Sequence, residues 1–244
     1  MKSDHYILSL QGSYKTSQVS LYKSTQCVQK SEIHSIKASA ALVPLIETLL
    51  WKEKISLSNL DYIALDQGPG AFTSLRVTIV TANAISFASK IQLIGINGLK
   101  ALALDMFLKR SALIKNNNIK IVCPLLNAYN NEVYSYAIRA DSFRSIISKP
   151  QCLNVETFLD TLKQKQPNKQ ILFTGNGSKM HRELIEKQLG QNAIFESTTI
   201  DQCSADSVAK LAFEHIAAEK KTAKKVLPIY MKKGMHTPKP KKAH

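Results

Sequence analysis

Apolar residues open the chain in short runs whose spacing is close to two. Residues 6–10 and 18–22 are rich in β-forming side chains and flank a turn-like stretch at 11–15. This pattern predicts a β-hairpin, and residues 27–33 predict a third strand. The spacing becomes helical over residues 38–51, where leucine and isoleucine recur on one face, so we expect a helix with a strongly apolar side there.

A strand, a glycine loop and a helix come next. The expected order is strand 61–66, loop 67–74, helix 75–89, strand 90–96 and helix 98–108. Residues 75–89 contain neither glycine nor proline, and Thr73 or Ser74 is the expected N-cap of that helix. Alternation of strands with helices is typical of an α/β layer.

A second α/β half follows the polar stretch 115–118, which we take as the boundary between two lobes. The expected elements are strands 119–128, 132–140 and 170–174, helices 154–166, 179–189 and 204–218, and a second glycine loop at 175–178. The predicted domains are a first lobe at 1–114, a second lobe at 115–232 that includes the last helix, and a basic flexible tail at 233–244.

The composition agrees with a globular chain. With 244 residues, of which 44% are hydrophobic, the protein can bury a substantial core. No apolar run approaches the roughly 18 residues that indicate a membrane span, and the first residues lack the features of a signal peptide. The four cysteines are far apart, which favours reduced thiols. We therefore expect a cytoplasmic protein with no membrane partner.

Basic residues exceed acidic ones and gather near the carboxyl end. The chain has 33 Lys and Arg against 18 Asp and Glu, a net charge of +15, and from Glu219 onward lysines are interrupted by no further acid. Such an excess favours a polyanionic partner, for which the tail is a candidate contact, or an acidic protein. A solvated surface that only keeps the protein soluble is the alternative.

The first glycine loop is the main candidate for ligand binding. Gly68 and Gly70 can adopt positive φ, and a helix that starts near Thr73 offers free N–H groups to an anion. These three residues are our candidate nucleotide-binding positions. The loop lacks the Lys-Ser/Thr ending of a P-loop and the third glycine of a dinucleotide fingerprint, so a tight turn without a ligand is the alternative, and no cofactor is assigned to this chain alone.

Side chains typical of catalysis or metal binding are not grouped in the sequence. The six histidines never occur at the i, i+4 spacing of helical metal sites. No serine lies in a GxSxG elbow, and Cys123 lies beside Pro124 in an apolar strand, where packing is the expected role. We assign no catalytic residue and no metal ligand.

One motif identifies a family. The sequence GPGAFT at 68–73, followed by Arg76, joins a predicted strand to a predicted helix and resembles the TsaB family, also called YeaZ-like. Further landmarks occur in the family's order: ILSL at 7–10, LIGI at 93–96, GLKALA at 98–103, EVY at 132–134 and PIYM at 228–231. The resemblance covers nearly the whole chain up to about residue 231.

The resemblance implies a fold of the actin-like, sugar kinase and heat-shock ATPase type, built from two related α/β lobes. It also implies a non-catalytic role in the bacterial machinery that makes N6-threonylcarbamoyladenosine beside the tRNA anticodon. Proteins of this family lack the metal-binding histidines of the catalytic subunit TsaD, associate with it, and help to form a complex with the small ATPase TsaE. ATP is then used by the complex, and a homodimer is a further option.

The sequence departs from the family pattern in three places. Gln11 stands where the family usually has an aspartate, Ala38-Ser39 stand where it often has His-Ser, and Asn-Ala-Tyr-Asn-Asn at 127–131 replaces Asp-Ala-Arg-Arg-Gly. Related ATPases use the missing acid around metal and phosphate. The departures therefore argue further against metal–nucleotide binding by this lobe.

Two predicted helices are more apolar than helices with one solvated face. An exposed apolar patch usually marks an interface, and in related proteins these helices form the bundle that joins subunits. The candidate interface residues are Leu42, Leu45, Ile46 and Leu49 on the first helix and Val77, Val80, Ala84 and Phe87 on the helix after the glycine loop. The alternative is that both helices are buried against their own sheet.

Two other functions remain open at this point. One is an autonomous ATP-dependent kinase or hydrolase of the same fold. The other is a free-standing basic protein that binds RNA through its lysines. Turnover by the isolated chain distinguishes the first of these from a partner subunit.

Overall fold

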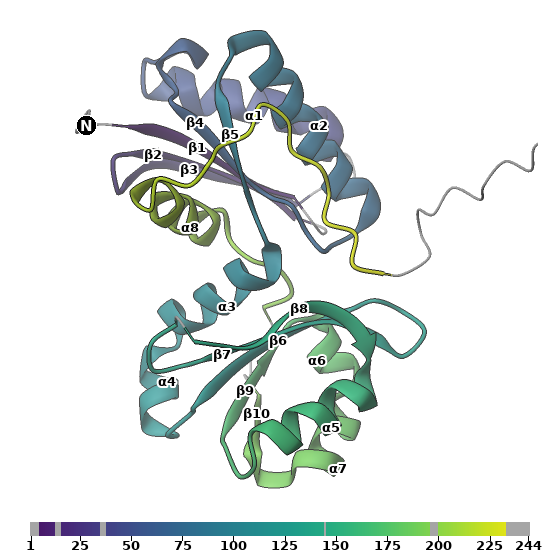
Figure 1. Ribbon diagram of the computed structural model, residues 1–244. Coiled ribbons are helices and arrows are strands. Elements are labelled where there is room, and N and C mark those ends of the chain that lie inside the picture. Colours follow the sequence, from purple (N-terminus) through teal and green to yellow (C-terminus); the bar gives the residue numbers. More distant parts are fainter. Residues whose placement is uncertain (1–4, 13–15, 35–37, 144, 196–199, 233–244) are drawn as a thin grey trace, which may run out of the picture.

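The computed structural model describes residues 5–12, 16–34, 38–143, 145–195 and 200–232, and all structural statements concern these residues. The chain forms two lobes, each built around a five-stranded mixed sheet (Figure 1). No helix of the described ranges is long and apolar enough to cross a bilayer.

The first sheet has the order β3-β2-β1-β4-β5. Its strands are β1 (Tyr6–Gln11), β2 (Thr16–Lys23), β3 (Gln26–His34), β4 (Tyr62–Asp66) and β5 (Gln92–Ile96). The first three strands form an antiparallel meander, while β4 and β5 run parallel to β1. Leu8 and Leu10 face one core cluster and Ile7 faces another, so this sheet is covered on both sides.

The helices α1 (Ala38–Lys52) and α2 (Phe72–Ser89) cover one face of the first sheet. The helix α8 (Ala205–Ala217) packs against β1, β2, β4 and β5 on the other face. Figure 1 shows the first sheet between these two layers. The sequence placed the last helix in the second lobe, and its contacts correct that placement, because its apolar side fits the face of the first sheet that α1 and α2 leave open.

The second sheet repeats the topology of the first. Its strands are β6 (Ile121–Asn127), β7 (Glu132–Arg139), β8 (Ile146–Asn154), β9 (Ile171–Thr174) and β10 (Ala193–Phe195), in the order β10-β9-β6-β7-β8. Its helices are α5 (Val155–Lys165), α6 (Asn176–Met180) and α7 (Arg182–Leu189). In both sheets an antiparallel meander is extended by two parallel strands, so the predicted two-lobed α/β fold is confirmed.

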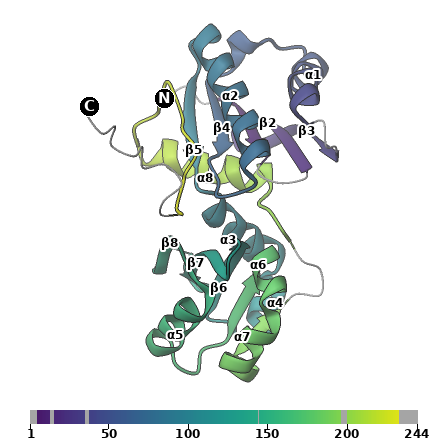
Figure 2. The same ribbon diagram turned by 90° about the vertical axis from the view of Figure 1, so that its right-hand side faces the viewer.

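Helices α3 (Gly98–Lys109) and α8 lie between the two sheets, as Figure 2 shows, and α4 (Ser111–Asn116) follows α3. One core cluster runs through this layer from the first sheet to the second, for example from Ile94 through Leu102 to Val122. The lobes therefore share buried apolar surface, which holds them together without a disulfide.

Several element boundaries differ from those predicted. The helix after the glycine loop begins at Phe72, and its N-cap is Ala71, whose side chain makes no capping hydrogen bond. Helix α6 begins inside the predicted loop 175–178, and His181 separates it from α7. The sequence missed β8, β10, α4 and the short 3₁₀ turns η1 (Leu57–Asn59) and η2 (Gly190–Asn192), since short or weakly periodic segments carry little signal.

Residues 222–232, which we call the strap, follow α8 and run along the edge of the first sheet. Ala223 forms an antiparallel bridge with Leu93 of the edge strand β5. Figures 1 and 2 both show this yellow segment beside β5, and in Figure 1 it continues along α2. The predicted basic tail at 233–244 lies outside the described residues, which end at Lys232.

Candidate functional site: the glycine loop and the outer face of helix α2

Gly68 lies in the tight turn of the glycine loop, and both of its backbone polar groups bond within the protein. Gly68 is buried with φ of +90°, a value that L side chains rarely adopt. Its N–H donates to Asp66 Oδ1 at 2.7 Å, and its carbonyl accepts from the N–H of Gly98 at 2.8 Å. A Cβ at Gly68 would lie 2.7 Å from Leu75 Cδ2. The turn therefore packs strand, helix and loop closely together.

The strap covers this loop from outside. Gln67 Nε2 donates to the carbonyl of Leu227 at 3.0 Å, and the N–H of Ile229 donates to the carbonyl of Gln67 at 2.9 Å. Because both backbone groups of Gly68 are used inside the protein, Gly68 does not fit the predicted contact with a nucleotide. Gly70 and Thr73, which is exposed, stay predictions as nucleotide contacts.

The outer face of α2 exposes large apolar side chains. Phe72 is 48% exposed, Val80 64% and Phe87 79%. The guanidinium of Arg76 lies 3.5 Å from the centre of the Phe72 ring and donates to the hydroxyl of Tyr230 at 3.1 Å. Residues four apart on a helix share a face, so Phe72, Arg76 and Val80 form one stripe. We call Phe72, Arg76, Val80, Ala84 and Phe87 the α2 face.

The eight predicted interface residues divide between this surface and the core. Val80, Ala84 and Phe87 are exposed, while Leu45 and Val77 are half-buried. Leu42, Ile46 and Leu49 are at most 2% exposed and belong to the core under the first sheet, so the prediction that these three face a partner is wrong. They are the apolar side by which α1 packs against its own lobe.

The sequence missed other exposed apolar residues. Trp51 at the end of α1 is 77% exposed, and the strap adds Leu227 and Tyr230 beside α2. The ring of Tyr230 lies 6.3 Å from that of Phe72. No sequence spacing could have paired residues 72 and 230, because the strap meets α2 only in the folded chain.

A buried polar cluster joins the lobes. Asp105 of α3 accepts hydrogen bonds from the hydroxyls of Ser204 and Ser207, at 2.7 and 2.8 Å, where α8 begins. The ammonium group of Lys109 lies 3.1 Å from Asp105. Burial, together with Asp66 and Asp105 nearby, raises the pKa of the Cys203 thiol well above its usual range. The carboxylate of Asp105 is thus satisfied by the start of α8, which indicates a structural role.

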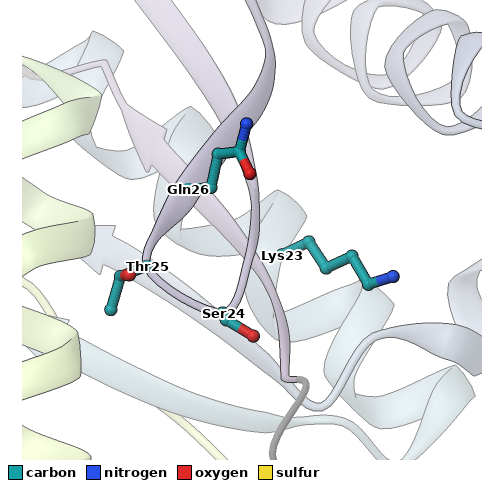
Figure 3. Close-up of a pocket in the computed structure, with 4 residues that line it drawn as sticks. All are labelled: Lys23, Ser24, Thr25 and Gln26. Atoms are coloured by element: carbon teal, nitrogen blue, oxygen red, sulfur yellow. The ribbon is translucent and has the colours of Figure 1, made fainter.

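Potential metal ligands lie apart in the described part of the chain. No three histidine, cysteine, aspartate or glutamate side chains come together there in a way that could hold a metal ion. Gln11, where the family resemblance led us to expect an acid, is fully buried at the end of β1. A hollow of about 360 Å³ lies at the β2–β3 turn, but its four lining side chains point in different directions (Figure 3).

Comparison with known families decides the identity of the chain. The family model described as TsaD, tRNA N6-adenosine threonylcarbamoyltransferase, matches residues 17–240. The chain belongs to this family, in its TsaB (YeaZ-like) group. Two structures of Pseudomonas aeruginosa, YeaZ and an uncharacterised protein similar to it, share the fold, with TM-scores of 0.72 and 0.75 over 93% of this chain at 20% and 19% identity. The YeaZ-like fold that the sequence implied is therefore confirmed.

Several curated relatives carry the name tRNA threonylcarbamoyladenosine biosynthesis protein TsaB. The protein of Haemophilus influenzae is 24% identical over 91% of this chain and 97% of its own length. The protein of Buchnera aphidicola from Schizaphis graminum is 34% identical over 40% of this chain, and the match spans 46% of that relative, about half its length.

Proposed function

We propose that this protein is a non-catalytic partner subunit in the formation of N6-threonylcarbamoyladenosine next to the tRNA anticodon, and that it associates with a TsaD-like catalytic subunit. The match of residues 17–240 to the TsaD family carries this proposal. Relatives named TsaB, which align with three quarters or more of this chain, support it. The glycine loop, whose Gly68 is fully occupied by protein contacts, supports a structural role for that motif.

The α2 face is the proposed contact with the catalytic subunit. Val80 and Phe87 are the most exposed large apolar residues of this helix, and Ala84 lies between them in the sequence. Leu227 and Tyr230 of the strap widen the apolar surface. Removing such side chains from water is the main favourable term in association. The same surface could support a homodimer when the catalytic subunit is absent.

Two further partners are proposed. A TsaE-like ATPase joins through the complex, and tRNA is the second. ATP is used by that complex in this proposal, and no described residue of this chain is assigned to hold it. The lysines from Lys220 onward are the proposed contact with tRNA, because this segment of the chain carries positive charge and contains no acidic residue.

Capture from a native lysate tests the proposal without assuming an activity. The full chain, immobilised through a tag, should retain a TsaD-like protein in near-equimolar amount. The control bait is the Phe87→Glu variant, which should retain markedly less. Retention of no TsaD-like protein by the native chain would contradict the proposal.

The two alternatives give different results in the same preparation. An autonomous kinase or hydrolase predicts ATP turnover by the purified chain at a rate that a TsaD-like partner does not change. A free-standing RNA-binding protein predicts capture of RNA without a TsaD-like subunit. We expect neither result.

A further inference from the structure

Four exposed lysines occupy the segment between α8 and the point where the strap meets α2. They are Lys220, Lys221, Lys224 and Lys225, which we call the lysine ridge. None of their ammonium groups has an ion-pair partner among the described residues, whereas the nearby Lys232 pairs with Glu132 at 2.7 Å. The ridge thus concentrates uncompensated positive charge on six consecutive residues.

The backbone beneath the ridge is held in place. Ala223, between the two lysine pairs, exchanges both backbone hydrogen bonds with Leu93, at 2.8 and 2.9 Å. Thr222 donates to Gln92 at 3.2 Å. The Ser86 hydroxyl, which donates to the carbonyl of Ile91 at 2.6 Å, lies 3.4 Å from the carbonyl of Lys224. The middle of the ridge is therefore fixed to the edge strand of the first sheet and differs in this respect from a free tail.

A side-chain amide clamps the end of the ridge. Asn83 Oδ1 accepts from the N–H of Val226 at 2.8 Å, and Asn83 Nδ2 donates to the carbonyl of Val226, also at 2.8 Å. The Val226 side chain is 4% exposed and belongs to the core between α2 and the sheet. Because this segment is ordered before any ligand arrives, binding to it loses less conformational entropy than binding to a flexible tail would.

We propose that the lysine ridge binds the phosphate backbone of RNA alongside the α2 face. The inference rests on the proposed function, in which the complex acts on tRNA, and it assigns the contact to residues 220–225, where α8 gives way to the folded strap. Ammonium groups act as point charges on phosphate and release condensed counterions. Contacts to phosphate position RNA without reading its bases, so the ridge binds RNA with little preference for sequence.

The position of the ridge suits this role. The strap passes from the ridge along α2 to Tyr230, so the ridge and the α2 face are neighbouring surfaces (Figure 1). A catalytic subunit seated on the α2 face would leave the lysines at the edge of the interface. RNA held there would lie beside the catalytic subunit.

A salt titration with paired variants tests the proposal. Full-length Lys224→Gln/Lys225→Gln is compared with Lys165→Gln/Lys169→Gln, which removes two exposed lysines near the end of α5 in the other lobe. Unmodified bulk tRNA is the probe, and both variants keep residues 233–244. For the ridge variant we expect the slope of log Kd against log salt concentration to fall by about 1 to 2, since each phosphate contact contributes roughly 0.7–0.9. We expect the α5 variant to keep the native slope, and equal slopes for the two variants would overturn the proposal.

Two further measurements separate geometry from charge and RNA from other polyanions. Asn83→Leu removes the clamp without changing the charge, and it should weaken tRNA binding severalfold. Native affinity in this variant would overturn the claim that a fixed strap is needed.

Poly-glutamate should compete for the ridge far less well than RNA, and equal competition would show a general polyanion surface. Capture of the TsaD-like subunit, measured on the same variants, should be unchanged, so failure of the proposed function is detected separately.

Discussion

At the scale of single residues, Gly68 is the position where the family motif and the physical requirement coincide. Its positive φ and the 2.7 Å approach of a Cβ to Leu75 leave little room for a side chain. We expect Gly68→Ala to lower the free energy of unfolding by about 1–3 kcal/mol through backbone strain, with an added cost from the overlap. Chemical denaturation of the isolated chain measures this change.

A double-mutant cycle distinguishes strain from overlap. Leu75→Ala removes the atom that a new methyl group would meet, so Gly68→Ala/Leu75→Ala should destabilise the protein less than the sum of the single changes. Simple additivity would show that the methyl group at Gly68 does not meet Leu75.

The residue scale also shows what a motif can establish. GPGAFT, together with the order of the other landmarks, was sufficient to predict the family that the comparison confirms. It was not sufficient to decide whether Gly68 meets a ligand, since that depends on Gln67 and on the strap, which lies about 160 residues away in the sequence. Contacts that a distant segment makes with a loop cannot be predicted from the sequence of the loop itself.

At the scale of elements, α2 carries the prediction for the interface. Val80→Glu is expected to weaken association with the TsaD-like subunit at least tenfold and to leave a folded monomer, because Val80 is 64% exposed. Met180→Glu is the matched control, since Met180 is 63% exposed on α6 of the other lobe. Analytical ultracentrifugation of each mixture measures association, and circular dichroism measures folding. Equal association of both variants would place the interface elsewhere.

Helix existence was predictable, but the side of each helix that faces solvent was less so. The spacing of Leu42, Ile46 and Leu49 predicted α1 correctly, and the same spacing cannot tell a core face from an interface face. The structure assigns these three residues to the core. Helix α8 was predicted within one residue at each end, yet its lobe was not, because chain order does not determine which sheet a helix covers.

At the scale of the whole molecule, the strap contacts both lobes. Lys232 pairs with Glu132 at 2.7 Å and donates to the carbonyl of Ala128 at 2.9 Å, both in the second lobe, while Val226 is anchored on α2. The hydrogen bond to Glu132 raises the pKa of Lys232 above its usual value. The contribution of this ion pair to the stability of the fold is therefore complete at neutral pH, and it is lost only as pH rises through the raised pKa.

We expect Lys232→Ala to change global stability by less than about 1 kcal/mol, because the ion pair is partly exposed. Its effect should be local: faster amide hydrogen exchange at 226–232 and at the β6–β7 turn. Lys225→Ala is the control, because Lys225 is exposed and has no ion-pair partner among the described residues. Identical exchange in the two variants would show that the strap does not link the lobes.

The central claim is that this chain is required by a TsaD-like catalytic subunit and is inactive alone. The most direct measurement is the formation of threonylcarbamoyladenosine on unmodified tRNA by a reconstituted mixture of the TsaD-like and TsaE-like proteins, threonylcarbamoyl donor and ATP. We expect product only when the native chain is added, and much less product with Val80→Glu in its place. Product at the same rate without the chain, or product from the chain without the TsaD-like subunit, would contradict it.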